Sequence, residues 1–414
     1  MRRTGVLFST AVLVAGLSAP AAASGPEGTL DPTFGTGGRT TSDMGGIDVV
    51  EDVIPWGDRL LVVGEVWRRT AFVARYTHAG RLDRTFSGDG RIILRFPTFL
   101  GGVDAAITPD DHLVVMAPHV AADGRHTVTS LSRYEPNGRL DTSFGEEGRI
   151  DLPRVEATAI AVDSDGRLLL AGAVRDGSKR DGFAAVRLTA GGRRDHRFSR
   201  DGVAIASFPF REEARQVLAL PGGRVLVAGY GVIGGCSGGG CTTPYLLARF
   251  GSGGRPDTSF GGDGRVNGHT DMGCTCGPNV AIDPFGRIVA GENYIIARVL
   301  PSGAPDSSFG EHGVVDLFAL QNRFVRTAGV VTTQPDGRIL VIVDGDDNVG
   351  RVTRFTADGR LDTSFGFRGR APLPSTEHRP SFRALALDAD GRILAAGDTL
   401  RRLTPLNVVI ARYT

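Results

Sequence analysis

Four cysteines are the residues of this chain whose types and spacing most directly suggest chemistry. Cys236 and Cys241 lie in one glycine-rich segment, Cys274 and Cys276 lie in the next, and His269 is five residues before Cys274. Thiols so placed can form disulfides or hold a metal ion, but Cys-x4-Cys and Cys-x-Cys are not typical zinc spacings. We expect two disulfides between the segments, because a direct Cys274–Cys276 bond would be strained; a metal site is the alternative.

Other residues able to carry chemistry are scattered along the chain. The eight histidines form no sequence cluster, and the nucleophile-elbow, His-Glu-x-x-His and P-loop motifs are absent from the sequence. The segment Asp344-Gly-Asp346-Asp-Asn348 alternates oxygen-bearing side chains as in half a calcium loop, but Val349 stands where glycine is expected. We therefore interpret this segment as a solvated turn and identify no catalytic residue.

A charged pair that recurs along the chain is the other feature able to carry chemistry. An Asp-x-x-Phe motif, with a glycine four residues after the phenylalanine, occurs seven times at a spacing of about 55 residues. The seven sets are Asp31, Phe34 and Gly38; Asp83, Phe86 and Gly90; Asp141, Phe144 and Gly148; Asp195, Phe198 and Gly202; Asp257, Phe260 and Gly264; Asp306, Phe309 and Gly313; and Asp362, Phe365 and Gly369. In six copies an arginine precedes the aspartate by eight residues, at Arg75, Arg133, Arg187, Arg249, Arg298 and Arg354. Because one active site does not need seven copies of a pair, we interpret it as a structural ion pair.

Each recurring position has a physical reason. The arginine ends an apolar, β-branched run that predicts a strand, and the aspartate can accept hydrogen bonds from backbone amides in a turn. The phenylalanine is predicted to be a buried wedge between neighbouring repeats, and the glycine to have a positive φ or to pack against backbone. Removing one partner of a buried charge pair costs about 3–5 kcal/mol, so Asp257→Ala should lower the melting temperature.

A second recurring feature predicts hairpins. A turn such as Asp165-Gly166-Arg167 opens an apolar strand in most repeats, and another strand precedes this turn. A further strand follows the motif glycine, as it does after Gly90. Each repeat therefore predicts four strands: a after the motif glycine, b before the hairpin turn, c after it, and d ending in the motif arginine. We expect strand a to be innermost.

Seven repeats of four strands predict an all-β fold, a seven-bladed β-propeller of about four strands per blade. The two ends of the chain fit a closed ring. Asp31 has no arginine eight residues before it, and Arg412 ends an Ala-Arg-Tyr strand with no motif after it. These two residues can pair, so that the N- and C-terminal segments close the ring and residues 24–414 form a single domain.

The recurring residues resemble the delta-60 repeat, a bacterial family whose consensus is similar to Gly-Arg-Ile-Leu-Val-Ala-Gly, then Ala-Arg-Tyr, then Gly-Leu-Asp-Thr-Ser-Phe-Gly. The resemblance covers nearly all of residues 24–414; Gly286–Gly291 and Leu361–Gly366 are examples. It implies a β-propeller-like repeat protein, often secreted, and it supplies no agreed activity and no catalytic residues. Ser87 and Ser199 depart from the pattern, because the family has glycine after the phenylalanine.

Residues 1–23 are interpreted as a secretory signal peptide, with Arg2 and Arg3 before an apolar run and Ala21–Ala23 as the cleavage site. The run is too short for a transmembrane helix, so we expect no membrane span and a secreted, extracytoplasmic location. The formal net charge is +1, and no basic stripe indicates a nucleic-acid partner. Export also favours oxidised cysteines.

These observations leave three functions open. We expect a monomeric binding or scaffold module that holds an unknown protein, glycan or small-molecule ligand at a loop face or channel mouth, because the loops between strands c and d vary most. The alternative is a propeller enzyme, a lyase, hydrolase or cofactor-dependent oxidoreductase, with an active site at the channel mouth built from single residues of several blades. An envelope or adhesion component is the third possibility. No cofactor and no bound metal are predicted.

Overall fold

The computed structural model describes residues 26–66, 70–96, 98–121, 124, 126–176, 179–232, 244–268, 279–292, 294–317, 319, 328–344, 349–374, 380–399 and 407–414. These residues are almost all in antiparallel strands and tight turns, and the chain divides into two compact units. The first unit is formed mainly by Leu94–Asn279. The second is formed mainly by Val12–Trp67, Phe72–Ile93 and Val280–Thr414.

The first unit contains three sheets of four strands, each following the chain order from one edge to the other. Their strands are β6 (Asp104–Ile107), β7 (Leu113–Val120), β8 (Thr127–Tyr134) and β9 (Arg149–Pro153); β10 (Val155–Val162), β11 (Leu168–Asp176), β12 (Lys179–Leu188) and β13 (Val203–Ile205); and β14 (Arg211–Leu220), β15 (Arg224–Val232), β16 (Tyr245–Phe250) and β17 (Arg265–Gly268). A short 3-10 turn, Pro221–Gly223, joins β14 to β15.

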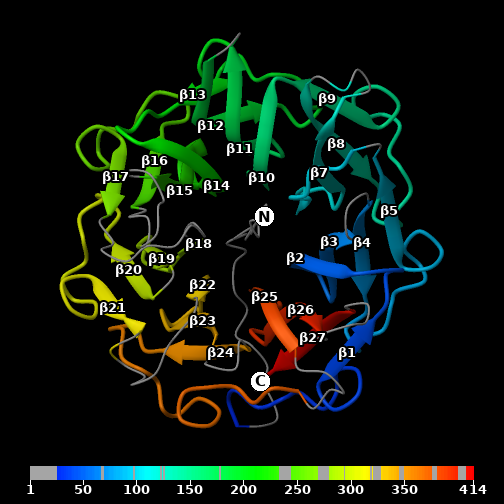
Figure 1. The fold of residues 1–414 in the computed structure, drawn as a ribbon, viewed down its shortest axis with the longest axis vertical. Coiled ribbons are helices and arrows are strands. Elements are labelled where there is room, and N and C mark those ends of the chain that lie inside the picture. Colours follow the sequence, from blue (N-terminus) through cyan, green and yellow to red (C-terminus); the bar gives the residue numbers. More distant parts are fainter. Residues whose placement is uncertain are drawn as a thin grey trace. The chain divides into compact units, whose positions relative to one another are not determined.

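The second unit contains the other four sheets. Their strands are β2 (Asp48–Trp56), β3 (Arg59–Val66), β4 (Thr70–Tyr76) and β5 (Arg91–Arg95); β18 (Asn279–Ile282), β19 (Ile288–Glu292), β20 (Ile295–Val299) and β21 (Val314–Asp316); β22 (Ala328–Thr333), β23 (Ile339–Asp344) and β24 (Gly350–Phe355); and β25 (Pro380–Leu387), β26 (Ile393–Thr399), β27 (Val408–Tyr413) and β1 (Arg39–Ser42). Beside β24, Arg370 forms a bridge with Thr353, which supplies the fourth position of that sheet. Seven successive sheets of this topology are the blades of a β-propeller, as the repeats predict (Figure 1).

The position of strand a within the sheet differs from the sequence-based expectation. Strand β5, which follows Gly90, pairs only with β4 and lies at one edge of its sheet. The first strands of neighbouring sheets pack together at the other edge, β6 and β14 against β10 in the first unit, and β2 and β22 against β25 in the second. The expectation that strand a is innermost is therefore wrong. The cause is the motif turn, in which the Arg75 amide donates to the Gly90 carbonyl at 2.9 Å and returns the chain alongside β4.

The N- and C-terminal segments share one sheet, as predicted. Arg39 pairs with Ala411 and Ser42 with Val408 in antiparallel register between β1 and β27. Before β1, Leu30 forms a further bridge with Tyr413. One blade is thus built from the two most distant parts of the second unit.

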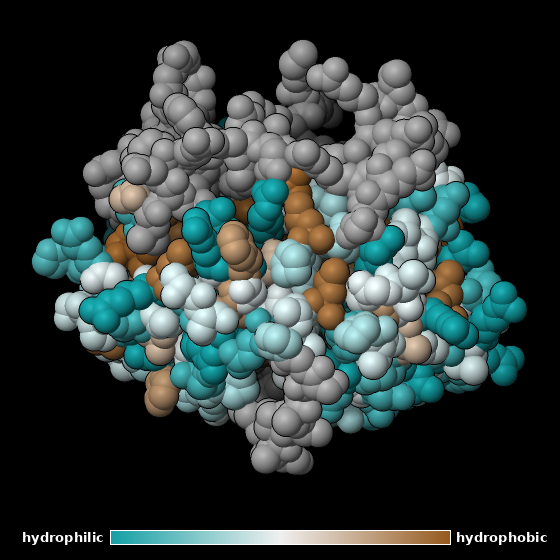
Figure 2. Space-filling model, turned by 90° about the horizontal axis from the view of Figure 1, so that it is seen from below, coloured by the Kyte–Doolittle hydropathy of each residue, from teal (hydrophilic) through white to brown (hydrophobic). Residues whose placement is uncertain are grey.

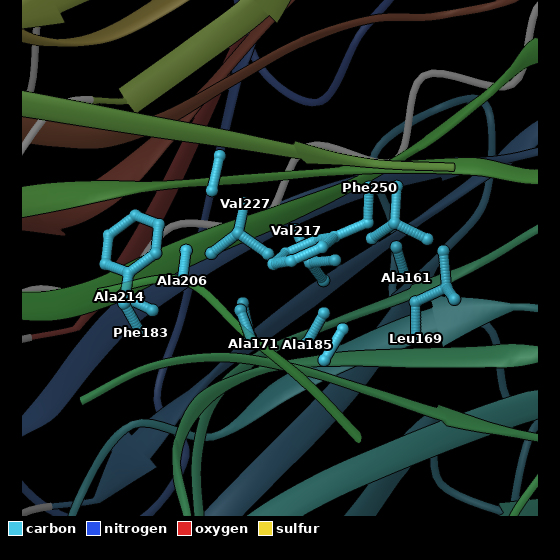
Figure 3. Packing of buried hydrophobic residues seen from close by; sticks show 14 of the residues in the cluster. Ala161, Leu169, Ala171, Phe183, Ala185, Ala206, Ala214, Val217, Val227 and Phe250 are labelled. Carbon is cyan, nitrogen blue, oxygen red and sulfur yellow. The ribbon is translucent and has the colours of Figure 1, made fainter. Parts of the chain in front are cut away.

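The motif phenylalanines are buried wedges, which confirms their predicted role. All seven have zero solvent exposure. In the first unit, Phe198 packs edge-to-face on Phe250 of the following sheet, with ring centroids 6.4 Å apart. Small residues such as Ala171 and Ala185 fill the remaining space of this core, so that two sheets approach closely (Figure 3).

The motif glycines also have the predicted conformation. Their φ angles are all positive, from 78° at Gly202 to 93° at Gly313, a region in which residues with a Cβ are strained. A Cβ on Gly38 would lie 2.6 Å from the Leu30 side chain, so space as well as φ requires glycine there.

The outer surface is mixed in polarity. On the side seen in Figure 2, brown apolar residues form separate patches among teal polar ones. The large apolar side chains that are exposed belong to different sheets or turns, for example Leu100, Phe285 and Phe367. Among the described residues, no helix has the length and hydropathy of a membrane-spanning segment.

Candidate functional site

The repeated Arg–Asp pairs form in every blade. The arginine Nε lies 2.7–2.9 Å from Oδ2 of its motif aspartate in six copies, eight residues apart. Arg412 and Asp31 make the seventh pair at 2.8 Å across the terminal sheet. The pairs are largely buried; for example, the side chains of Arg298 and Asp306 are 1% and 6% exposed.

The second oxygen of the motif aspartate organises the turn. Oδ1 of Asp306 accepts hydrogen bonds from the backbone amide and the hydroxyl of Ser308, at 3.1 and 2.6 Å. The Arg298 guanidinium also lies over the Phe309 ring, 4.4 Å from its centroid. Arginine, aspartate, hydroxyl and phenylalanine therefore form one packed unit, in which the cation–π contact adds to the ion pair.

A second basic side chain approaches six of the seven motif aspartates, and sequence analysis missed it. Arg287, from the hairpin turn between strands b and c, is 3.6 Å from Asp306, and Arg59 is 2.8 Å from Asp83. Arg338, Arg392 and Arg224 make the corresponding approach in other blades, and His112 takes this place beside Asp141. The signal was present in the sequence, because the arginine after the hairpin glycine recurs like the motif itself.

These contacts keep six motif aspartates ionised. Burial alone would raise the pKa of Asp31, Asp83, Asp141, Asp257, Asp306 and Asp362, but hydrogen bonds from the serine or threonine two residues later and from the paired arginine outweigh it, and each pKa is lowered. An acid with a lowered pKa holds no proton to donate at neutral pH. The predicted structural role of the pairs fits this chemistry.

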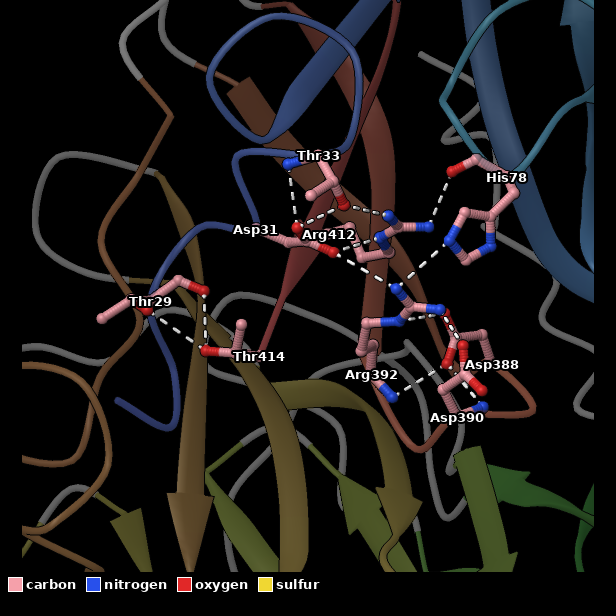
Figure 4. A network of polar contacts seen from close by, with 9 residues as sticks. All are labelled: Thr29, Asp31, Thr33, His78, Asp388, Asp390, Arg392, Arg412 and Thr414. Atoms are coloured by element: carbon pink, nitrogen blue, oxygen red, sulfur yellow. Dashed lines mark hydrogen bonds and ion pairs between the residues drawn. The ribbon is translucent and has the colours of Figure 1, made fainter. Parts of the chain in front are cut away.

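The terminal sheet repeats this network between distant segments (Figure 4). Arg412 donates through Nη1 to the His78 carbonyl at 2.7 Å and through Nη2 to the Thr33 hydroxyl at 3.0 Å. Arg392 lies 3.0 Å from Asp388 and 3.5 Å from Asp31. The N-terminal motif is thus held by two arginines, one in β27 and one in the turn between β25 and β26.

A different kind of charged cluster lies where β2 packs beside β25 and β26. Asp48 at the start of β2 and Asp398 near the end of β26 both have zero exposure, and Glu65 in β3 is 4% exposed. Oδ1 of Asp398 accepts a hydrogen bond from Arg383 at 2.6 Å, and Oδ2 of Asp48 accepts one from the Met44 amide at 2.7 Å. The other carboxylate oxygen of each aspartate has no hydrogen-bond partner among the described residues.

The pKa values of the acids in this cluster are raised, whereas those of six motif aspartates are lowered. Burial raises the pKa of Asp48 to about 7, with the charges of Asp43 and Asp398 adding to the effect and the Met44 amide and Arg91 opposing it. Burial likewise raises the pKa of Asp398 and of Glu65, against the attraction of Arg383. Asp48, Glu65 and Asp398 were not identified from the sequence. The signal available was an acid directly after the glycine of strand c, at Gly64-Glu65 and Gly397-Asp398.

An arginine-lined hollow of about 690 Å³ lies against the turn between β4 and β5. It is lined by Arg81, Leu82, Arg84, Gly88, Asp89 and Arg91. The lining offers guanidinium groups and one carboxylate, and it contains no serine, cysteine or histidine that could act as a nucleophile or base. Its chemistry is that of anion binding.

Several predicted features lie outside the described residues. These are the four cysteines, Cys236, Cys241, Cys274 and Cys276, with His269, the signal segment 1–23, and residues 345–348 of the acidic loop. Disulfides, signal cleavage and the variable loop 233–243 therefore stay predictions. Among the described residues, no group of three or more His, Cys, Asp or Glu side chains is placed to hold a metal ion.

The fold and its repeated turns define a β-propeller repeat protein. A protein family described as "Domain of unknown function (DUF5122) beta-propeller" matches residues 334–365, which contain the hairpin turn at Arg338, strand arginine Arg354 and the motif Asp362–Phe365. The match supports a propeller repeat family and does not name the delta-60 repeat. No curated protein matches the chain in sequence.

Solved structures provide more distant similarities. The GH93 α-L-arabinofuranosidase of Fusarium graminearum is 10% identical with a TM-score of 0.44, over 90% of this chain and 98% of that one. Polysaccharide lyase Uly1 is 10% identical with a TM-score of 0.44, over 99% and 97%. The GH43 endo-arabinanase of Bacillus licheniformis is 13% identical with a TM-score of 0.36, over 73% and 91%. The activities in these names belong to those proteins.

Proposed function

We propose that this chain is a secreted binding or scaffold module, whose ligand or partner is held at a loop face of the propeller. The proposal is carried by one observation: the repeated arginines and aspartates pair with each other. Seven arginine–aspartate pairs are bound to each other within turns, so that the most regular polar residues serve the frame. A rigid frame with irregular loops is a typical arrangement for binding.

The chemistry of the described hollow supports the same proposal. Arg81, Arg84 and Arg91 can bind an acidic group, and Asp89, the carboxylate of the lining, is paired with Arg91. The proposed secretion rests on the signal sequence of residues 1–23, and the two proposed disulfides would then join loops outside the frame.

The native intact mass of the exported protein tests this proposal, measured without reductant or chelator. We expect cleavage near residue 23, a mass four hydrogens below that of the reduced chain, and no stoichiometric metal. The same protein would then be passed over immobilised acidic and neutral glycans and incubated with them. Retention without release of new reducing ends or unsaturated sugars supports a binding module, whereas turnover would overturn it.

The buried carboxylates favour a second candidate, an enzyme of the hydrolase or lyase class. A general acid works best when its pKa lies near the working pH, and the pKa of Asp48 is raised to about 7. Asp398 and Glu65 supply further acids in the same cluster. In the glycan incubations, turnover that Asp48→Asn and Asp398→Asn both abolish, while binding persists, would establish this candidate; turnover unaffected by both variants would exclude it.

A further inference from the structure

We infer that the hollow beside the β4–β5 turn is a specific oxyanion site, which takes a carboxylate, sulfate or phosphate group of an acidic ligand. The inference rests on the proposed binding function and assigns it a place and a ligand chemistry. It is carried by three observations: the charge of the lining, the rigidity of the turn, and the difference between this turn and its six counterparts.

The charge of the lining is strongly positive. Three guanidinium groups, of Arg81, Arg84 and Arg91, face one carboxylate, Asp89. Asp89 lies 3.3 Å from Arg91 Nε and accepts a hydrogen bond from the Arg91 amide at 2.9 Å, so its charge is already engaged. The side chains of Arg81 and Arg84 are exposed, and within the described part of the chain neither has a hydrogen-bond or ion-pair partner. Two guanidinium groups are therefore available for a ligand.

The turn that carries the lining residues is held rigidly. Asp83, next to Arg84, accepts hydrogen bonds from Arg75 at 2.9 Å and from Arg59 at 2.8 Å. Two cations offset the charge of this buried carboxylate, so that it repels a nearby anion less. Phe86 is fully buried and fixes the other side of the turn. Binding then costs less conformational entropy, because the turn that carries the arginines is already ordered.

The hollow depends on two residues that the other turns do not combine. Arg84 occupies the position directly after the motif aspartate, where the other copies have Pro32, Thr142, His196, Thr258, Ser307 and Thr363. Gly88 occupies the second position after the phenylalanine, where the others have Thr36, Glu146, Arg200, Gly262, Glu311 and Phe367. A Cβ built on Gly88 meets nothing within 4 Å, so this side of the turn is open. This copy alone combines an arginine directly after the motif aspartate with glycine at that open position.

The copy around Asp257 supplies a matched control. It has Arg255, Gly262, Asp263 and Arg265 where the hollow has Arg81, Gly88, Asp89 and Arg91, but Thr258 replaces Arg84. Arg84→Thr therefore makes the charged residues of the two turns the same, with Leu82 against Pro256 as the remaining difference, and Thr258→Arg does the reverse. Arg255→Ala removes one exposed positive charge from the turn that lacks the proposed site.

The test is a calorimetric titration of the full-length mature protein with three probes: an oligogalacturonate for carboxylate, a heparin oligosaccharide for sulfate, and inorganic phosphate. We expect at least one probe to bind, Arg84→Thr to weaken it about tenfold or more, Arg255→Ala to change affinity less than about twofold, and Thr258→Arg to raise the stoichiometry towards two. The preferred probe identifies the source of the oxyanion. Unchanged melting temperatures show that the variants are folded.

Equal losses for Arg84→Thr and Arg255→Ala would overturn the inference, because general charge attraction would then explain the binding. Absence of binding by all three probes would also overturn it. In that case the proposed function still stands if the glycan or native-mass experiments detect a neutral ligand or a protein partner. Failure of the specific site and failure of the binding function are therefore distinguishable.

Discussion

The motif turns and the β2–β26 contact both bury carboxylates, but only the motif turns supply enough donors. Asp306 accepts hydrogen bonds from Arg298 and from the amide and hydroxyl of Ser308, and its pKa is lowered. Asp398 is at least as buried, but Arg383 bonds only one of its oxygens, and its pKa is raised. Burial alone thus does not decide the charge of an acid; the donors around it do.

The difference also separates frame from candidate site. The paired acids recur in every blade and lie in regular turns, whereas Asp48, Glu65 and Asp398 are confined to one boundary between blades. The same fold gives the motif aspartates several hydrogen-bond donors in every blade. Buried acids that have few donors are therefore candidates for function. Three substitutions test this comparison, and their expected effects decrease in the order given.

The largest effect is expected from Asp257→Ala. The variant leaves the buried Arg249 without its paired carboxylate, which should lower the free energy of unfolding by about 3–5 kcal/mol at neutral pH. The pKa of Asp257 is lowered from 3.8, so the wild-type advantage is present above that value and lost as the pH falls through the folded-state pKa. Urea unfolding at pH 7 and pH 3 measures both effects.

The same turn contains a control for this change. Asp263 pairs with Arg265 at 2.6 Å, but their side chains are 53% and 41% exposed. Since exposed ion pairs contribute about 0–1 kcal/mol, Asp263→Ala should cost little. Similar losses for the two variants would show that burial of the motif pair adds nothing.

Asp48→Asn is expected to act in the opposite direction. The native pKa of Asp48 is raised to about 7 from 3.8, so the folded protein loses stability as the pH rises between these values. Asparagine cannot ionise and can still accept the Met44 hydrogen bond, so the variant should be more stable than wild type by about 2–4 kcal/mol at pH 8.

The measurement is urea unfolding of both proteins at pH 5 and pH 8. At pH 5 the advantage of the variant should be clearly smaller than at pH 8, because Asp48 is then ionised in the unfolded chain but still carries its proton in the folded protein. Asp43, Arg91 and Asp398 act on Asp48 and stay unchanged in the variant. A variant less stable than wild type at pH 8 would show that the ionised carboxylate is stabilised in the fold.

The smallest effect concerns the motif copy that lacks a hydroxyl. Arg197 stands two residues after Asp195, where Ser308 follows Asp306. Arg197→Ser should add the hydroxyl bond to Asp195 Oδ1 and raise the free energy of unfolding by about 0.5–1.5 kcal/mol. Ser308→Ala should remove a similar amount. Calorimetry measures the melting temperatures of both variants. Shifts of the same sign would contradict the predicted role of the hydroxyl.

The sequence was sufficient to predict the fold, because the residues that build it recur. The arginine–aspartate pairs, the phenylalanine wedges, the positive-φ glycines and the pairing of Asp31 with Arg412 were each predicted from spacing and are confirmed. The position of strand a within the sheet was not predicted correctly. Spacing alone does not show that the chain returns beside β4 after Gly90. That return depends on backbone hydrogen bonds within the turn.

The candidate site was harder to predict, because its residues do not recur. Asp48 and Asp398 are at opposite ends of the sequence, and only the packing of β2 beside β25 and β26 makes them neighbours. Their raised pKa values follow from burial with few hydrogen-bond donors, and no sequence motif indicates this combination. Arg84 was overlooked for a related reason: it stands at a position where the repeat tolerates many residues.

The mixed origin of the terminal sheet has a consequence for folding. During synthesis, β1 is an unpaired edge until β27 emerges, because Arg39 requires Ala411 as its partner. Closing so long a loop is slow, and an exposed strand edge is a template for association with other chains. The interval before β27 is available should therefore be the period of greatest aggregation risk, and the yield of folded protein should depend on chaperones that protect this strand.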